Sequence, residues 1–288
     1  MNNLKGLWIM AAGFAVFSVT DTIAKILTAD FHPFQVAWSR YLGVVIGIVV
    51  LLVLKGPNMF KSAVPKLQVL RGLFAVTSAT CFIYGIRYVP LADAVAVTFS
   101  APFLVTLFAA LILKERVGPR RWAAVGIGFV GTLIIVRPGM GVFHPAIFLV
   151  LLAAVAFAFR QIISRPIGQR DATLTTLAYT GATSIIVLSI PLLFVWITPD
   201  SAKQVILLVV LTLLSGLGEF LIIRALELAE AVVVTPVHYS LIIFSTAWGY
   251  LFFNHLPDVW TWVGTSIVIG SGLYILLREK RLASSNYR

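Results

Sequence analysis

The chain has 288 residues, of which 60% are hydrophobic and 11% are charged, and its mean hydropathy is +0.99. Soluble proteins carry about 45–50% apolar and about 25% charged residues, so this chain has too few charged side chains to cover a water-soluble domain. The composition excludes a soluble enzyme or a DNA-binding protein, although the net charge is +11. It indicates an integral membrane protein.

Ten apolar stretches that are long enough to cross a bilayer follow one another along the chain. A membrane-spanning helix needs about 20 mostly apolar residues. The predicted helices cover residues 4–27, 33–54, 67–88, 91–114, 118–136, 145–165, 173–197, 203–228, 230–253 and 258–278. The first stretch is expected to span the membrane rather than to be a cleaved signal peptide, because its apolar run is long and no strongly basic segment precedes it. The predicted fold class is an all-α membrane protein with ten transmembrane helices.

Lys and Arg residues are distributed unevenly between the two sides that these helices define. Of the 22, 17 fall on the side of the N-terminus, four on the opposite side and one, Arg40, inside the second helix. Cytoplasmic segments of membrane proteins are enriched in Lys and Arg, so both termini are predicted to be cytoplasmic. The positive charge is therefore a signal of topology, and no nucleic-acid partner is expected.

One motif recurs 137 residues further along the chain. Ala92–Thr98 (ADAVAVT) resembles Ala229–Thr235 (AEAVVVT). This shift moves the chain by five helices, and because five is odd, the second copy must cross the membrane in the opposite orientation. The sequence predicts two inverted five-helix repeats, residues 1–139 and 140–288, a plan that secondary transporters commonly have. A chance similarity of two short apolar strings is the alternative.

Ionisable residues inside the predicted helices are few, and each is costly in the bilayer unless it is paired or hydrated. Asp21 and Arg40 lie at similar depths in the first two helices, and Lys25 follows Asp21 by one turn. We expect an Asp21–Arg40 contact with Lys25 nearby. Arg160 and Glu219 lie at similar depths on the cytoplasmic side, in the sixth and eighth helices, and are expected to pair as well. These five residues are candidates for gating ion pairs, and a purely structural role in helix packing is the alternative.

A substrate cavity is expected near the membrane midplane, between the two repeats. His238 and Tyr239 lie near the middle of the ninth helix, and the repeat places them opposite residues 99–103 of the fourth. Aromatic side chains with few polar groups favour a small amphipathic solute, although any single one of them is more often a packing residue. The candidate substrate-binding residues are Ser18, Ser78, Tyr84, Phe99, Ser100, Phe103, Gln161, Glu219, His238 and Tyr239.

No cofactor or metal is expected. The single Cys81 and the four scattered His residues have no metal-ligand spacing. Gly126-Ile-Gly128-Phe-Val-Gly131 has the glycine spacing of a dinucleotide-binding motif, but it lies inside a predicted membrane helix. Small residues there allow helices to approach closely. Gly43-x-x-x-Gly47 is interpreted in the same way.

Several short motifs are spread over nearly the whole chain: FQVAWSRY at 34–41, LRG at 70–72, ADAVAV at 92–97, Ala101-Pro102 with KER at 114–116, RALELAEA at 224–231 and Thr235-Pro236. Together they resemble the EamA family of the drug/metabolite transporter superfamily. The resemblance implies ten helices in two inverted repeats, a central cavity, a place in the bacterial inner membrane and the export of small metabolites, commonly amino acids.

The predicted function is alternating-access export of small metabolites, most of all neutral or aromatic amino acids, and not an enzymatic reaction. The expected partners are a small-molecule substrate and the lipid bilayer, and a monomer is compatible with the sequence. One alternative is a transporter or exchanger of phosphorylated or nucleotide-like anions that uses Arg40 and Arg160. An intramembrane enzyme acting on lipid and a structural or sensor protein are the other two.

Overall fold

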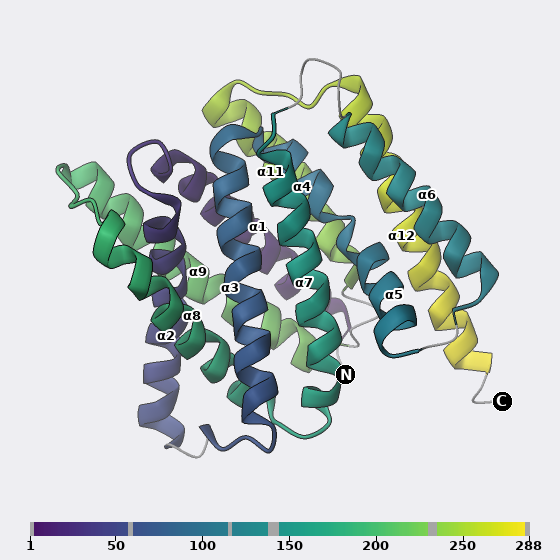
Figure 1. The fold of residues 1–288 in the computed structure, drawn as a ribbon, viewed down its shortest axis with the longest axis horizontal. Helices are drawn as coiled ribbons and strands as arrows, with labels where there is room; N and C mark the ends of the chain where they lie inside the picture. Colours follow the sequence, from purple (N-terminus) through teal and green to yellow (C-terminus); the bar gives the residue numbers. More distant parts are fainter. Residues whose placement is uncertain (1–2, 57–59, 115–116, 138–143, 230–234, 286–288) are drawn as a thin grey trace.

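The computed structural model describes residues 3–56, 60–114, 117–137, 144–229 and 235–285. Every regular element within these ranges is a helix (Figure 1). The elements are α1 (Asn3–Leu27), α2 (Pro33–Lys55), α3 (Pro65–Tyr88), α4 (Leu91–Thr98), α5 (Ala101–Ile112), α6 (Pro119–Val136), α7 (Ile147–Gly168), α8 (Thr173–Val195), α9 (Ala202–Leu228), the 3₁₀ helix η2 (Thr235–Tyr239), α11 (Ser240–Phe253) and α12 (Val259–Ser285). Helices occur where the sequence predicts them, and residues 230–234 of the ninth predicted helix lie outside the described residues.

The lengths and surfaces of these helices are those of a membrane protein. Within the described ranges, seven helical spans are long and apolar enough to cross a bilayer, with α4 and α5 together forming one of them. Two shorter apolar stretches, Trp122–Val136 and Val259–Ile275, add to these. Large apolar side chains point outward, such as Leu193 and Phe194, which are 82% and 84% exposed. A surface of this kind requires a hydrocarbon environment.

The fourth predicted helix is interrupted, and the described part of the ninth changes from a 3₁₀ helix to an α-helix. α4 ends at Thr98 and α5 begins at Ala101, with Pro102 in its first turn. In the second half, Pro236 lies in η2, which leads into α11. Proline has no backbone N–H to donate and its ring crowds the preceding turn, so it interrupts an α-helix. The sequence contains both prolines, but the prediction treated each segment as one continuous helix.

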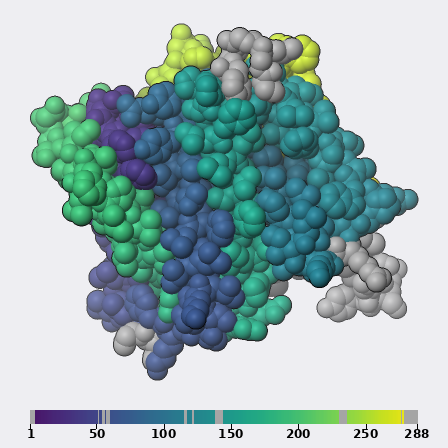
Figure 2. Space-filling view, viewed as in Figure 1, coloured from purple at the N-terminus to yellow at the C-terminus, as the bar shows by residue number. Residues whose placement is uncertain are grey.

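Neighbouring helices come from different halves of the chain. α1 packs on α9 and α11, α2 on α8 and α9, α3 on α7 and α8, and α6 on α12. In Figure 2, green α8, blue α3, green α7 and teal α5 follow one another across the visible face. Helices before residue 140 and helices after it therefore pack together in the interior of the molecule.

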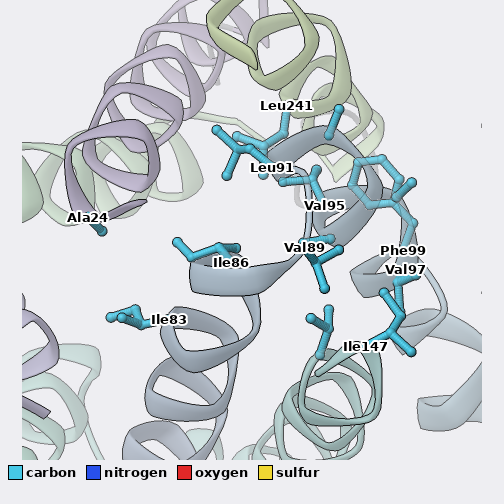
Figure 3. Close-up of a cluster of buried hydrophobic side chains, with 14 of the residues drawn as sticks. Ala24, Ile83, Ile86, Val89, Leu91, Val95, Val97, Phe99, Ile147 and Leu241 are labelled. Atoms are coloured by element: carbon cyan, nitrogen blue, oxygen red, sulfur yellow. The ribbon is translucent and has the colours of Figure 1, made fainter. Parts of the chain in front are cut away.

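The short helix α4 lies at the centre of the main hydrophobic core. Its apolar side chains between Leu91 and Phe99 are at most 5% exposed. They pack among Ile83 of α3, Ile147 of α7 and Leu241 of α11 (Figure 3). Apart from Asp93 and Thr98, α4 consists of apolar residues, as expected for a helix that is buried on most sides. The surrounding helices hold α4 in place, so the break after Thr98 lies next to the main hydrophobic core.

Candidate functional site

The two helix breaks meet at a group of four aromatic rings, which we call the aromatic junction: Phe14, Phe99, His238 and Tyr239. Phe99, between α4 and α5, makes edge contacts with His238 and Tyr239 of η2, with ring centroids 5.5 and 5.2 Å apart. Phe14 of α1 stacks on His238 at 4.8 Å. The structure thus brings together three residues that the sequence predicted to bind substrate. The sequence analysis missed Phe14. It lies seven residues, or two helical turns, before Asp21, so its place on the same face of the helix could have indicated it.

A buried ion pair lies further along the same helix. The Arg40 Nη1 of α2 donates to Asp21 Oδ1 of α1 at 2.6 Å, which confirms the predicted contact. The Arg40 guanidinium also lies 5.4 Å from the ring centre of Phe17. Phe14, Phe17, Ser18 and Asp21 are spaced by three and four residues, so they share one face of α1. This face connects the aromatic junction to the ion pair.

Lys25 does not join this pair within the described part of the chain. Its Nζ donates to the carbonyl oxygens of Ile86 and Val89 at 2.5 and 2.6 Å. A Lys side chain at the carbonyl end of a helix is favourable, because the last carbonyls there have no helical partner. Lys25 therefore ties α1 to the end of α3.

The predicted pair between Arg160 and Glu219 is wrong, since no such ion pair occurs among the residues that the structure describes. Arg160 instead lies over the ring of Phe157, with its Cζ 4.6 Å from the ring centre. The physical reason is that α7 packs on α3, α4 and α5, whereas α9 packs on α1 and α2. Equal depth in the membrane does not make two helices neighbours.

Arg71 forms a polar contact between three helices that the sequence analysis missed. Its Nε donates to Ser164 Oγ of α7 at 2.7 Å, and its Nη1 donates to Thr180 Oγ1 of α8. Ser164 in turn donates to the carbonyl oxygen of Arg160. Arg71 is one of the 17 basic residues that the sequence analysis assigned to the side of the N-terminus, although it lies inside the predicted helix 67–88. That position was the available signal.

Three other predicted substrate residues lie outside the aromatic junction. Ser78 donates to the carbonyl oxygen of Ala153 at 2.9 Å and so joins α3 to α7. The hydroxyl of Tyr84 lies 3.0 Å from His32 Nε2, in the connection before α2. Phe103 packs against Gly128 of α6, where an added Cβ would overlap its ring. These three residues hold helices together in this structure.

The remaining predicted residues are Glu219, Ser18, Ser100 and Gln161. Glu219 is half-buried on α9. Ser18 is buried and accepts a hydrogen bond from Trp248 Nε1 at 2.9 Å. Ser100 is buried at the break between α4 and α5, and its hydroxyl has no partner among the described residues. Gln161 is exposed on α7, next to Arg160. The site therefore offers hydroxyl groups near the aromatic junction and an amide near Arg160.

Side-chain hydrogen bonds at both ends of α8 join it to α2 and to the start of α3. At one end the Gln35 amide donates to the carbonyl oxygen of Ile197 at 2.8 Å and accepts from its N–H at 2.9 Å. At the other, the Asp171 carboxylate accepts from the Ser62 hydroxyl, the Ala63 N–H and the Gln68 amide. These donors, first of all Ser62, lower the pKa of Asp171.

His32 and Arg137 are two further polar residues in connections between the helices. Burial and the nearby positive charge of Arg87 lower the pKa of His32, which favours its neutral form. Arg137 of the connection after α6 pairs with Asp258 before α12. Within the described residues, no group of three or more His, Cys, Asp or Glu side chains could hold a metal ion.

Relatives with known names are similar to this chain over almost its whole length. It is 30% identical to the S-adenosylmethionine uptake transporter of Rickettsia prowazekii over 99% of this chain and 96% of that one. It is 29% identical to the pseudopaline exporter of Pseudomonas aeruginosa (88% and 89% covered) and 27% identical to the riboflavin transporter of Rhizobium johnstonii (96% and 91% covered).

A solved crystal structure has the same fold, with a TM-score of 0.65 at 19% identity, covering 96% of this chain and 98% of that one. The sequence model of the EamA-like transporter family matches residues 4–137 and again residues 144–277. The family and the named relatives are transporters, so the protein is a multi-pass membrane transporter of small molecules and not an enzyme. Over nearly its whole length, this chain belongs to the EamA-like transporter family.

Proposed function

We propose that this protein is an alternating-access transporter for a metabolite that carries both an amino-acid group and a flat heteroaromatic ring, of the S-adenosylmethionine type. The observation that carries the proposal is the aromatic junction, which lies on the same face of α1 as the buried Asp21–Arg40 pair. The similarity to a whole-length relative named as an S-adenosylmethionine uptake transporter supports this substrate class.

The proposed architecture is ten membrane crossings in two inverted halves, residues 1–139 and 140–288. The family model matches each half separately. The helix contacts support the same plan, because they are unchanged when the halves are exchanged: α1–α9 becomes α7–α3, α2–α9 becomes α8–α3, and α2–α8 and α6–α12 map onto themselves. Inverted repeats of this kind rock around a site at their interface.

Polar contacts at and near the helix ends support ten alternating crossings. Gln35 binds Ile197, Gln204 donates to Asp30, and Arg137 pairs with Asp258. In the ten-crossing plan all of these residues belong to the outer side. The contacts of Asp171 with residues 62–68 join segments that the plan assigns to the cytoplasm. The excess of Lys and Arg on that side agrees with this orientation in a bacterial inner membrane.

We propose a division of roles within the site. The flat ring of the substrate would stack within the aromatic junction, because aromatic rings prefer stacked and edge-to-face contacts. Its charged amino and carboxylate groups would meet Glu219 and Arg160, and its polar atoms would meet Ser18, Ser100 and Gln161. Asp21 and Arg40 would gate the site. Arg160 suits a carboxylate, because it has no carboxylate partner within the described residues.

Export of neutral or aromatic amino acids, which the sequence analysis favoured, receives no support from the names of the relatives. Anion exchange remains an alternative that one observation favours, namely the buried Nε of Arg160, which has no hydrogen-bond partner in the described structure. The pairing of Arg40 with Asp21 disfavours it, since an anion site needs unpaired cations.

Uptake by proteoliposomes tests the proposal. We expect saturable uptake of labelled S-adenosylmethionine that excess unlabelled S-adenosylhomocysteine inhibits and that methionine or adenosine alone inhibits weakly, because each carries only half of the recognised groups. Measurement with and without a pH gradient separates proton coupling from facilitated diffusion. Uptake of phenylalanine without uptake of S-adenosylmethionine would contradict the proposed substrate class. Inhibition by nucleoside monophosphates alone would favour the anion alternative.

A further inference from the structure

α6 and α12 lie side by side at the edge of the molecule (Figure 1). A groove of about 390 Å³ lies between them. The two helices touch at Gly131 and Gly264, where a Cβ added to Gly264 would lie 2.6 Å from the Gly131 carbonyl oxygen. The groove occupies the stretch before this contact on α6 and after it on α12. None of its lining residues belongs to the aromatic junction, whose Tyr239 contacts α12 at the neighbouring Gly272.

The groove has a basic end and an apolar body. Arg120 lines it two residues before the apolar stretch that begins at Trp122, so its guanidinium lies at the boundary of the hydrocarbon. Tyr274 also lines the groove and is 47% exposed, and Trp122 is 40% exposed. Trp and Tyr are enriched at this depth of a bilayer. One turn and two turns further along α6, the lining consists of Ala123 and Ile127.

The apolar body opens toward the lipid. Ile127 is 54% exposed, although it lies within a stretch of helix that is apolar enough to be in the membrane. On α12 the wall contains Gly270, and a Cβ added there would meet nothing within 4 Å. The groove therefore has room for a slender apolar chain that enters from the side.

We propose that this groove binds an anionic glycerophospholipid, with its phosphate on Arg120 and one acyl chain along Ala123, Ile127 and Gly270. Charge complementarity supports this occupant, because no carboxylate in the described residues pairs with Arg120. Basic pockets between membrane helices bind anionic headgroups. A soluble anion would leave the apolar body empty, and a zwitterionic lipid would bring no net charge to the guanidinium.

Lipid binding to the purified full-length protein in detergent tests the proposal, with native mass spectrometry as the readout and phosphatidylglycerol and phosphatidylcholine as probes. Arg120→Gln is expected to weaken phosphatidylglycerol binding about tenfold, because a charge-assisted hydrogen bond is lost. Arg170→Gln is the matched control, since Arg170 is an exposed arginine of the α7–α8 connection. It is expected to retain wild-type binding.

A second pair of variants tests the acyl-chain half of the site without removing charge. Gly270→Leu fills the open space in the groove and is expected to weaken phosphatidylglycerol binding. Gly126→Leu places the same side chain at a position of α6 that does not line the groove and where a Cβ meets nothing within 4 Å, and it is expected to have no effect.

Equal loss of lipid in both arginine variants would overturn the proposal, as would equal binding of the two lipids by the wild type. If inorganic phosphate competes fully with phosphatidylglycerol, the groove is a soluble-anion site. If Gly270→Leu dissociates a dimer and leaves lipid binding unchanged, a second copy of the chain is the occupant. Each of these two results also rejects the lipid.

Discussion

Asp21→Asn is expected to destabilise the protein by about 3–5 kcal/mol, because removing one partner of a buried ion pair leaves the other charge without compensation. Asp21 and Arg40 side chains are 6% and 18% exposed and bind at 2.6 Å. The same change is expected to reduce transport at least tenfold, since the pair lies on the face of α1 that carries Phe14. Thermal unfolding in detergent and uptake by proteoliposomes measure the two effects separately.

Two further variants separate the effect of this ion pair on stability from its effect on transport. Asp21→Asn combined with Arg40→Gln removes both charges and is expected to recover most of the stability but none of the transport. Arg224→Gln is the control, because it breaks the Arg224–Glu227 pair, whose side chains are 52% and 55% exposed. Its effect on stability should stay within about 1 kcal/mol. Wild-type stability of Asp21→Asn would show that the pair contributes little.

Gly43→Ala is expected to prevent stable packing of α2 on α9. A Cβ at Gly43 would overlap the Thr212 carbonyl oxygen, and one at Gly216 would lie 2.8 Å from the Gly43 carbonyl oxygen. Both obstacles are backbone atoms, so the helices must separate, and they would lose the buried hydrogen bond from Thr212 Oγ1 to the Ser39 carbonyl oxygen. We expect a loss of at least about 1–3 kcal/mol. Size-exclusion chromatography and thermal unfolding of the purified variant measure it.

Gly47→Ala is the matched control on the same helix, one turn further on. A Cβ at Gly47 meets nothing within 4 Å, so the change should be neutral or stabilising by up to about 1 kcal/mol, because Ala has the higher helix propensity. Gly43 and Gly47 look equivalent in the sequence, and the structure assigns the close approach to Gly43 alone. Equal stability of the two variants would contradict this assignment.

The Asp21–Arg40 contact could be predicted because the two helices are consecutive in the sequence. A short connection keeps such helices near each other, so equal depth was enough to bring the side chains together. For Arg160 and Glu219 the same argument failed, since their helices are not consecutive and do not pack on each other. Depth can be estimated from sequence, but the lateral order of helices depends on packing surfaces that no local pattern reveals.

Phe99 and Phe103 show why the candidate site could be predicted only in part from the sequence. They are four residues apart, and on one continuous helix they would share a face. The break before Ala101 separates them, so that Phe99 contacts His238 while Phe103 packs on Gly128. Pro102 is the sequence signal for this break, but the direction in which the chain turns there is set by the helices around α4.

These two phenylalanines provide the most direct test of a substrate site at the aromatic junction. They are 1% and 3% exposed, so replacing either by Leu removes similar buried volume. The measurement is the KM of S-adenosylmethionine uptake by proteoliposomes containing Phe99→Leu or Phe103→Leu. Phe99→Leu should raise KM about tenfold, because ring contacts that position His238 and Tyr239 are lost, while Phe103→Leu should keep the wild-type KM. An equal KM in both variants would contradict the account.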